Sequence, residues 1–95
     1  MREHHRSRTE IAAQILEAAI GGTTKTKIMY KTYVSYEQLK EYLPALLQNR
    51  LLVYDEGTYL YKTTGKGLKL LMIINRLSEY LIKPEQQTPA RAVIA

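Results

Sequence analysis

Apolar residues recur at helical spacing along the first half of the chain. A first helix is predicted over residues 9–20, where apolar positions repeat every three to four residues and the pattern ends at Gly21. Thr24 is a suitable cap for a second helix, which is only about two turns long and ends near Lys31. A turn at residues 32–34 then separates this short helix from the next one.

A third helix is predicted to begin at Tyr36. Ser35 and Gln38 stand in the S-x-x-Q relation of a capping box, in which each side chain bonds to the backbone amide of the other residue. Pro44 lies inside the pattern and removes one helical hydrogen bond, so we expect a kink or a break there. The apolar stripe of this helix comprises Tyr36, Leu39, Leu43, Leu46 and Leu47.

After this helix, the residue pattern changes to one that is typical of strands. Two short runs, 51–54 and 58–62, are rich in β-branched and aromatic residues and flank the turn-forming residues 55–57. This arrangement predicts a β-hairpin with a tight turn. Its second strand is expected to carry Tyr59 and Tyr61 on one face.

Thr64 is predicted to cap a last helix over residues 65–82, which Pro84 ends. Apolar residues in this helix cover more than one face and follow the three-four rhythm of a coiled coil. Part of the helix must fold back on its own domain, and the remaining apolar surface predicts a homodimer. The expected dimerisation residues are Leu70, Leu71, Ile74, Leu77, Ser78 and Leu81.

The order helix, short helix, turn, capped helix and hairpin is that of a winged helix-turn-helix. We therefore expect an α+β, mainly α fold, a winged helix-turn-helix with a long C-terminal dimerisation helix. The alternative is a generic α+β domain whose elements happen to follow this order. The expected divisions are a flexible basic arm (1–7), the winged-helix domain (8–64), a coiled-coil helix (65–83) and a disordered tail (84–95).

Composition narrows the possible functions. The 95 residues carry a net charge of +5, which favours a polyanionic partner, and the absence of cysteine excludes disulfides, zinc ribbons and thiol nucleophiles. His4 and His5 lack further ligands, so we expect no metal site, and we find no cofactor motif, small-molecule site or catalytic set. Charged residues interrupt the longest apolar stretch, 68–82, so no membrane span is expected. No signal peptide is expected either, because no apolar core follows the charged residues 1–8. The chain is not expected to be an enzyme.

A helix-turn-helix presents the start of its second helix to the major groove of DNA. The residues that begin the short helix before it provide ammonium groups, a hydroxyl and free helix amides for a phosphate. Gln38 has the side chain that pairs with adenine, and Glu37 repels phosphate unless it accepts from cytosine. The candidate DNA-binding residues are Lys25, Thr26, Lys27, Lys31, Ser35, Tyr36, Gln38, Lys40, Lys62 and Arg8.

These residues also have purely structural interpretations. The lysines can lie on a solvated helix end, Ser35 can serve only as a cap, and Tyr36 can belong to the core stripe. A minor-groove arm can be formed by Arg2, Arg6 and Arg8, although a disordered tail is the simpler expectation. Asp55 and Glu56 in the wing tip argue against its insertion into a groove.

Three segments, 24–30, 35–43 and 64–67, resemble an archaeal winged-helix family that includes the ten-kilodalton chromatin proteins of thermoacidophiles. Their sequences are Thr-Lys-Thr-Lys-Ile-Met-Tyr, Ser-Tyr-Glu-Gln-Leu-Lys-Glu-Tyr-Leu and Thr-Gly-Lys-Gly, and the resemblance spans residues 8–82. It implies a winged helix followed by a long C-terminal helix that pairs antiparallel with a second subunit. It also implies DNA binding that is either sequence-tolerant or directed to an operator.

The sequence therefore predicts a homodimer that binds double-stranded DNA as a transcriptional regulator or a chromatin-type protein. Such a protein is expected in the cytoplasm, associated with the nucleoid. The alternative is a winged helix that serves as a protein-protein interaction module without direct DNA binding, which the acidic wing tip, Glu37 and Glu41 favour. The double substitution Lys25→Ala with Lys27→Ala distinguishes the two, since only a DNA-binding protein would lose phosphate contacts.

Overall fold

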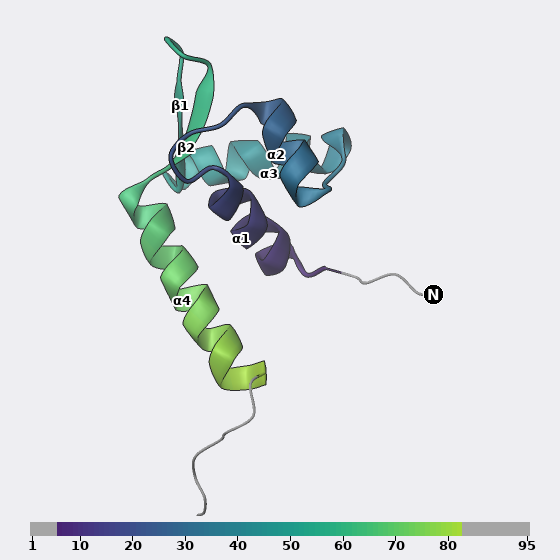
Figure 1. Cartoon of the computed structure of the whole chain (residues 1–95), viewed down its shortest axis with the longest axis vertical. Coiled ribbons are helices and arrows are strands. Elements are labelled where there is room, and N and C mark those ends of the chain that lie inside the picture. The colour runs from purple at the N-terminus through teal and green to yellow at the C-terminus, as the bar shows by residue number, and fades with distance from the viewer. Residues whose placement is uncertain (1–5, 83–95) are drawn as a thin grey trace, which may run out of the picture.

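The computed structural model describes residues 6–82, which form four helices and one two-stranded antiparallel sheet (Figure 1). The elements are α1 (Arg8–Ala18), α2 (Lys25–Thr32), α3 (Tyr36–Gln48), β1 (Leu52–Asp55), β2 (Leu60–Thr63) and α4 (Gly65–Ile82). Helices α1 to α3 form the body of the molecule, the β1–β2 hairpin protrudes from it as the wing, and α4 extends in another direction. The predicted α+β, mainly α winged helix with a long C-terminal helix is confirmed.

The start of α1 is fixed by a capping box between Ser7 and Glu10, which was not predicted. The Ser7 hydroxyl accepts a hydrogen bond from the Glu10 amide (3.0 Å), and a Glu10 carboxylate oxygen accepts one from the Ser7 amide (3.3 Å). Ser7, and Arg6 before it, are therefore part of the folded unit, although the sequence analysis assigned both to the arm. The predictions made on residues 1–5 and 83–95 lie outside the described residues.

The connection from α1 to α2 follows the predicted pattern. Helix α1 ends at Ala18, two residues before the predicted end, and the chain turns through Gly21 and Gly22, which both take positive φ angles. The Thr24 hydroxyl caps α2 by accepting a hydrogen bond from the Lys27 amide (3.2 Å), as its position in the sequence indicated.

Helix α3 begins at Tyr36, as predicted, and its capping box with Ser35 is formed. The expected break at Pro44 does not occur: α3 continues through the proline, which is exposed, whereas the inner face of the helix is buried. That inner face comprises Leu39, Tyr42, Leu43 and Leu46. Tyr36, which the sequence pattern placed in the apolar stripe, is instead 50% exposed.

The wing has a longer loop and a shorter second strand than the sequence predicted, and its first strand is shifted by one residue. Its register pairs Tyr54 with Tyr61, and the centroids of the two rings lie 4.6 Å apart. Residues 56–59 form the loop, so Tyr59 lies outside the strand, with a φ angle of 62°. The expectation that Tyr59 and Tyr61 share a strand face was wrong, because the turn extends two residues beyond Gly57.

Backbone hydrogen bonds fasten the wing to the body. Thr23, just before α2, exchanges two backbone hydrogen bonds with Tyr61 of β2 (2.8 and 2.7 Å). Thr63 at the end of β2 donates its amide to the Ala19 carbonyl (3.1 Å) and its hydroxyl to the Leu16 carbonyl. The base of the wing is thus held by α1 and its connection to α2, whereas the tip extends away from the body (Figure 1).

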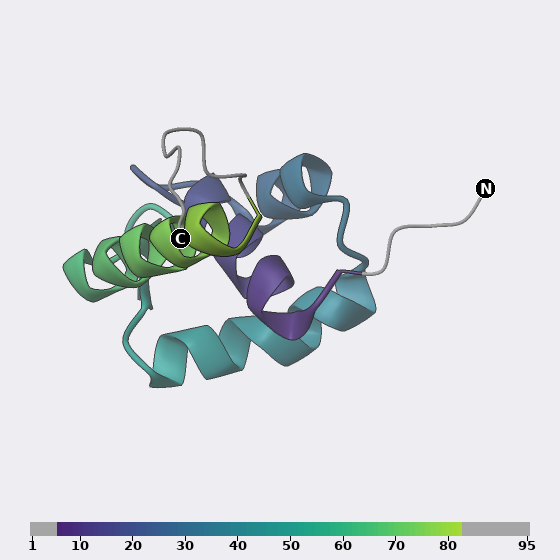
Figure 2. The same ribbon diagram turned by 90° about the horizontal axis from the view of Figure 1, so that it is seen from below.

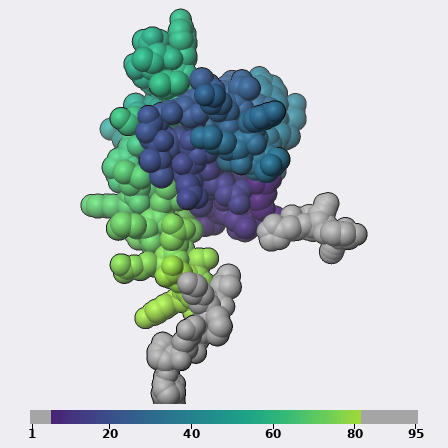
Figure 3. All heavy atoms as spheres, in the orientation of Figure 1, coloured from purple at the N-terminus to yellow at the C-terminus, as the bar shows by residue number. Residues whose placement is uncertain are grey.

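Helix α4 has a packed N-terminal half and an exposed C-terminal half. Its first turn approaches the wing so closely that a Cβ atom on Gly67 would clash with the Leu51 carbonyl, and Leu71 belongs to the hydrophobic core. Figure 2 shows α4 beside α1, with which it is in contact. Its last turns project beyond the body (Figures 1 and 3).

Candidate nucleic-acid interface

Two lysines from different helices converge on one tyrosine ring at the start of α3. The Nζ atoms of Lys25, at the start of α2, and Lys40, in the second turn of α3, each lie 5.6 Å from the centroid of the Tyr36 ring. At this distance the electron-rich face of the ring attracts a cation. Tyr36 therefore lies on the surface beside two ammonium groups, and we call these three side chains the Lys25–Tyr36–Lys40 patch.

The start of α2 adds further groups that can bind phosphate. The first amides of a helix have no intrahelical acceptor. Among them, the Thr24 hydroxyl accepts a hydrogen bond from the Lys27 amide only. The amides of Lys25 and Thr26 therefore lie at the positive end of the helix dipole, close to the exposed Lys27 side chain. Helix α2 contains three lysines and no acidic residue, so nothing on this helix opposes an anion.

The capping box of α3 occupies the two polar side chains that were expected to contact DNA from this helix. The Ser35 Oγ atom accepts from the Gln38 amide, and the Gln38 Oε1 atom accepts from the Ser35 amide, both at 3.1 Å. A bidentate contact between Gln38 and adenine would need the same Oε1 atom. Both residues lie at the start of α3 as predicted, but part of their hydrogen-bonding capacity is already used.

The two glutamates of α3 have different surroundings. Arg8 of α1 pairs with Glu41 (3.1 Å), and its guanidinium carbon lies 5.4 Å from the centroid of the Tyr42 ring. The hydrogen bond to Glu41 raises the pKa of Arg8. Glu37 is exposed in the first turn and forms no ion pair with any residue of the described range. Arg8 thus offsets the negative charge of Glu41 but not that of Glu37.

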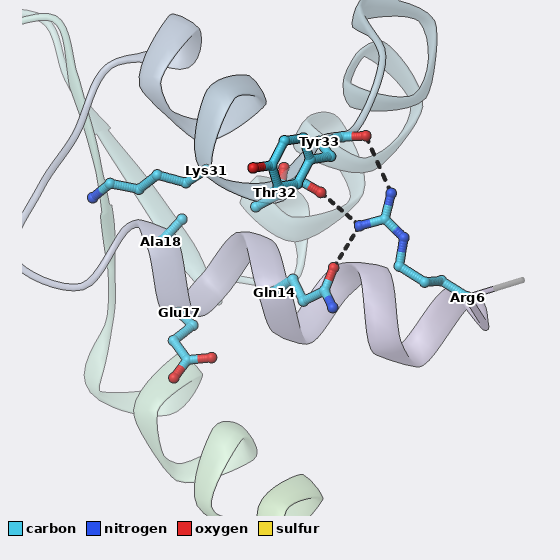
Figure 4. A pocket seen from close by; sticks show the side chains of 7 residues that line it. All are labelled: Arg6, Gln14, Glu17, Ala18, Lys31, Thr32 and Tyr33. Atoms are coloured by element: carbon cyan, nitrogen blue, oxygen red, sulfur yellow. Dashed lines mark hydrogen bonds between the residues drawn. The ribbon is translucent and has the colours of Figure 1, made fainter. Parts of the chain in front are cut away.

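Lys31 and Lys62 are not part of the Lys25–Tyr36–Lys40 patch. Lys31 is in the last turn of α2, at the end opposite to Lys25, where it lines a pocket that also includes Glu17 (Figure 4). Lys62 is exposed on β2, opposite Val53 of β1. The structure therefore brings together the candidates at the starts of α2 and α3 but not these two.

The wing tip is acidic and is held by its own hydrogen bonds. Asp55 accepts hydrogen bonds from the Thr58 hydroxyl (2.7 Å) and the Gly57 amide (3.2 Å). These bonds, that of Thr58 first, lower the pKa of Asp55. Glu56 beside it is exposed as well, so the tip presents two carboxylates to the solvent.

Sequence reasoning missed Arg6, which lies where the helix-turn-helix changes direction. Its guanidinium donates to the Thr32 carbonyl (2.6 Å), the Tyr33 carbonyl (3.2 Å) and the Gln14 Oε1 atom (2.6 Å) (Figure 4). The S-x-x-E pattern from Ser7 predicts that α1 begins directly after Ser7, one residue beyond Arg6. No pattern indicates the carbonyls, which lie 26 and 27 residues away in the chain.

The predicted dimerisation residues do not share one exposed face. Leu71 is buried, Leu70 and Ile74 are half-buried, and Leu77, Ser78 and Leu81 are exposed. Leu71 is only 6% exposed and Leu70 packs against the same core, so both serve the fold of their own protomer. Ile73 and Tyr80, which were not in the predicted set, are exposed beside Leu77 and line a shallow pocket with it.

Within residues 6–82, no three His, Cys, Asp or Glu side chains gather closely enough to hold a metal ion. In the same range, no helix has the length and apolar character needed to cross a membrane. The sequence model of the winged helix-turn-helix family matches residues 5–81 of the chain. No curated protein matches it.

Proposed function

This chain belongs to the winged helix-turn-helix family, and we propose that it binds double-stranded DNA as a homodimer, acting as a transcriptional regulator or a chromatin-type protein in the cytoplasm, associated with the nucleoid. The observation that supports this best is the Lys25–Tyr36–Lys40 patch, which joins the starts of α2 and α3 into one cationic surface. Phosphates bound there would position the protein on the duplex while the first turns of α3 enter the major groove. No cofactor is part of the proposal.

The grip on DNA is expected to come largely from phosphate contacts. The cationic side chains of this surface, including Lys27, are ammonium groups, which are suited to phosphate oxygens. The groups best suited to base edges, on Ser35 and Gln38, are engaged in the capping box. Binding should therefore weaken steeply as the salt concentration rises, because bound phosphates release their counterions.

Titration of mixed-sequence duplexes at two salt concentrations tests the proposal. In the double variant Lys25→Ala with Lys27→Ala, two phosphate contacts are lost, so binding should weaken for all sequences. The slope of log affinity against log salt should fall by roughly 1.8, about 0.9 for each contact. Lys69→Ala, which removes an exposed positive charge from α4, serves as the control and should leave the slope close to that of the wild type. A wild-type chain that binds no duplex at either salt concentration would contradict the proposal.

The regulator and the chromatin-type protein differ in specificity. A regulator would favour one duplex by orders of magnitude over random DNA, whereas a chromatin-type protein would bind most duplexes with similar affinity. Selection of bound duplexes from a random pool separates the two, since only a regulator would enrich a common sequence.

Dimerisation is expected to use the exposed apolar strip of α4, which comprises Ile73, Leu77, Tyr80 and Leu81. A strip of this kind on one helix is typical of a surface that a second copy covers. The resemblance to the archaeal family implies an antiparallel pair of α4 helices, which would place two copies of α3 on one duplex.

Light scattering coupled to gel filtration tests the dimer with a matched pair of variants. Ile73 and Met72 are both 61% exposed, but only Ile73 belongs to the strip. Ile73→Glu should give the 11.0 kDa monomer, because it buries a charge in the dimer interface. Met72→Glu should keep the wild-type mass of the dimer, which is about twice as large. A wild-type chain that remains a monomer at every concentration would contradict dimerisation.

A second candidate function is a protein-protein interaction module. It is favoured by the acidic wing tip and by Tyr30 and Tyr33, which are 81% and 86% exposed on α2 and the turn after it. Large aromatic side chains are common in protein interfaces. The Lys25→Ala with Lys27→Ala variant would then show no DNA phenotype, because the module would have no phosphate contacts to lose.

A further inference from the structure

The turn between α2 and α3 has an unusual backbone. Tyr33 follows α2 in the left-handed conformation (φ 58°, ψ 28°), which residues other than glycine rarely adopt. Its side chain is almost fully exposed, so side-chain packing does little to hold this conformation. Only Val34 separates Tyr33 from Ser35, the N-cap of α3. A change in the Tyr33 backbone would therefore pass directly to the start of α3.

Arg6 supplies the contacts that the Tyr33 side chain does not. Its guanidinium donates to the carbonyl oxygens of Thr32 and Tyr33 and, on the other side, to the Gln14 side chain of α1 (Figure 4). Carbonyl groups at the C-terminal end of a helix lack intrahelical donors and carry partial negative charge. A planar guanidinium with several fixed donors suits such a site, and it ties the turn to α1.

From these contacts we infer that Arg6 is a positioning residue for DNA binding. It holds the turn and thereby sets the direction in which α3 leaves α2, without contacting the DNA. The inference rests on the proposed function. Arg6 lies at the C-terminal end of α2, whose eight residues place it about 10 Å along the helix axis from Lys25. The Arg6 guanidinium is already bound to three acceptors of the protein itself, so we assign it no phosphate.

Duplex titrations at two salt concentrations, with Arg6→Ala, Arg6→Lys and Lys69→Ala beside the wild type, test the inference. Arg6→Ala should weaken binding about three- to tenfold, as expected for a residue that acts from outside the contact surface. Its salt slope should remain that of the wild type, because no phosphate contact is lost. Arg6→Lys keeps the charge but has one nitrogen in place of the fork, so it should remain weaker than the wild type. Lys69→Ala loses one positive charge, as Arg6→Ala does, but should bind DNA like the wild type.

Amide hydrogen exchange without DNA supplies an independent measurement. The Tyr33 amide bonds to the Met29 carbonyl (2.9 Å), and the Ser35 amide bonds to Gln38. Both should exchange faster in Arg6→Ala, whereas the Leu68 amide, which bonds to Thr64 at the start of α4 (2.9 Å), should change little. A fold that is merely less stable would instead expose the Leu68 amide as well when the whole chain unfolds.

Three results would overturn the inference. A salt slope reduced by about 0.9 in Arg6→Ala would mean that Arg6 binds a phosphate directly. Wild-type affinity of folded Arg6→Ala, or full recovery in Arg6→Lys, would mean that its hydrogen bonds do not position α3. Unchanged exchange at Tyr33 and Ser35 would mean that Arg6 does not hold the turn. If the wild type binds no duplex, the proposed function fails, and the exchange rates still show whether Arg6 holds the turn.

Discussion

The helix-turn-helix and the wing differ in how firmly they are held. Helices α2 and α3 bury Ile28, Leu39 and Leu43 in the core, and Arg6 ties the turn between them to α1. In the wing only the base is buried, at Leu52 and Thr63, and the tip depends on the hydrogen bonds of Asp55. The helix-turn-helix is thus a rigid support for side chains, whereas the wing tip has only local structure.

The same two regions also differ in charge. The starts of α2 and α3 carry the lysines that meet at Tyr36, and the wing tip carries Asp55 and Glu56. Since DNA is a polyanion, we expect the firmly held region to be the one that attracts it. This comparison predicts that DNA affinity depends on the helices and that changes at the wing tip have small effects.

The largest effect is expected on stability. Leu39→Ala removes a fully buried side chain from α3 and should lower the free energy of unfolding by about 2–5 kcal/mol. Val53→Ala changes a residue of β1 that is half exposed and should cost less than about 1 kcal/mol. Urea denaturation of both variants measures the difference. Equal losses would mean that the wing is as firmly held as the helices.

An intermediate effect is expected from removing one acidic charge in each region. Glu37→Gln should raise affinity for duplex DNA about fivefold at low salt, which corresponds to roughly 1 kcal/mol of repulsion between charges 4 Å apart in water. Glu56→Gln, at the wing tip, should change affinity less than twofold, because repulsion between charges falls with distance and we expect the tip to lie farther from the DNA. Fluorescence anisotropy titrations compare the two. A larger gain from Glu56→Gln would place the wing tip nearer to the DNA than α3.

The smallest effect is a pH dependence confined to the wing tip. The Thr58 hydroxyl and the Gly57 amide lower the pKa of Asp55, so their stabilisation of the turn is complete above the pKa of an unfolded aspartate, about 4. It should be lost as the pH falls below that value and through the lowered pKa of the folded state. The Gly57 amide chemical shift should follow this loss, and Asp55→Asn should abolish it. A change in the Gly57 chemical shift centred above pH 5 would show that a group other than Asp55 causes it.

The sequence predicted several of the features that depend on neighbouring residues. The caps at Thr24, Ser35 and Thr64 involve groups within three positions of each other, so their patterns are visible in the chain. The loop at residues 56–59 was predicted too short, because nothing in the pattern marks Tyr59 for a positive φ angle.

Features that depend on distant residues were not predictable in the same way. The heptad rhythm of α4 indicated apolar positions but not that the wing and α1 cover Gly67 and Leu71. Tyr36 followed the apolar stripe of α3, yet its ring lies at the surface beside lysines of two helices. Arg6 was assigned to an arm because its acceptors are at least 26 residues away, apart from Gln14. The DNA-binding and dimerisation residues stay predictions.

Chemical-shift mapping of the labelled protein during titration with a mixed-sequence duplex shows whether the helices or the wing tip contact DNA. We expect the largest amide shift changes at Lys25 to Lys27 and at Tyr36 to Lys40, and little change at the wing tip, residues 56–58. Absence of shift changes at the starts of α2 and α3, or larger changes at the wing tip, would contradict this expectation.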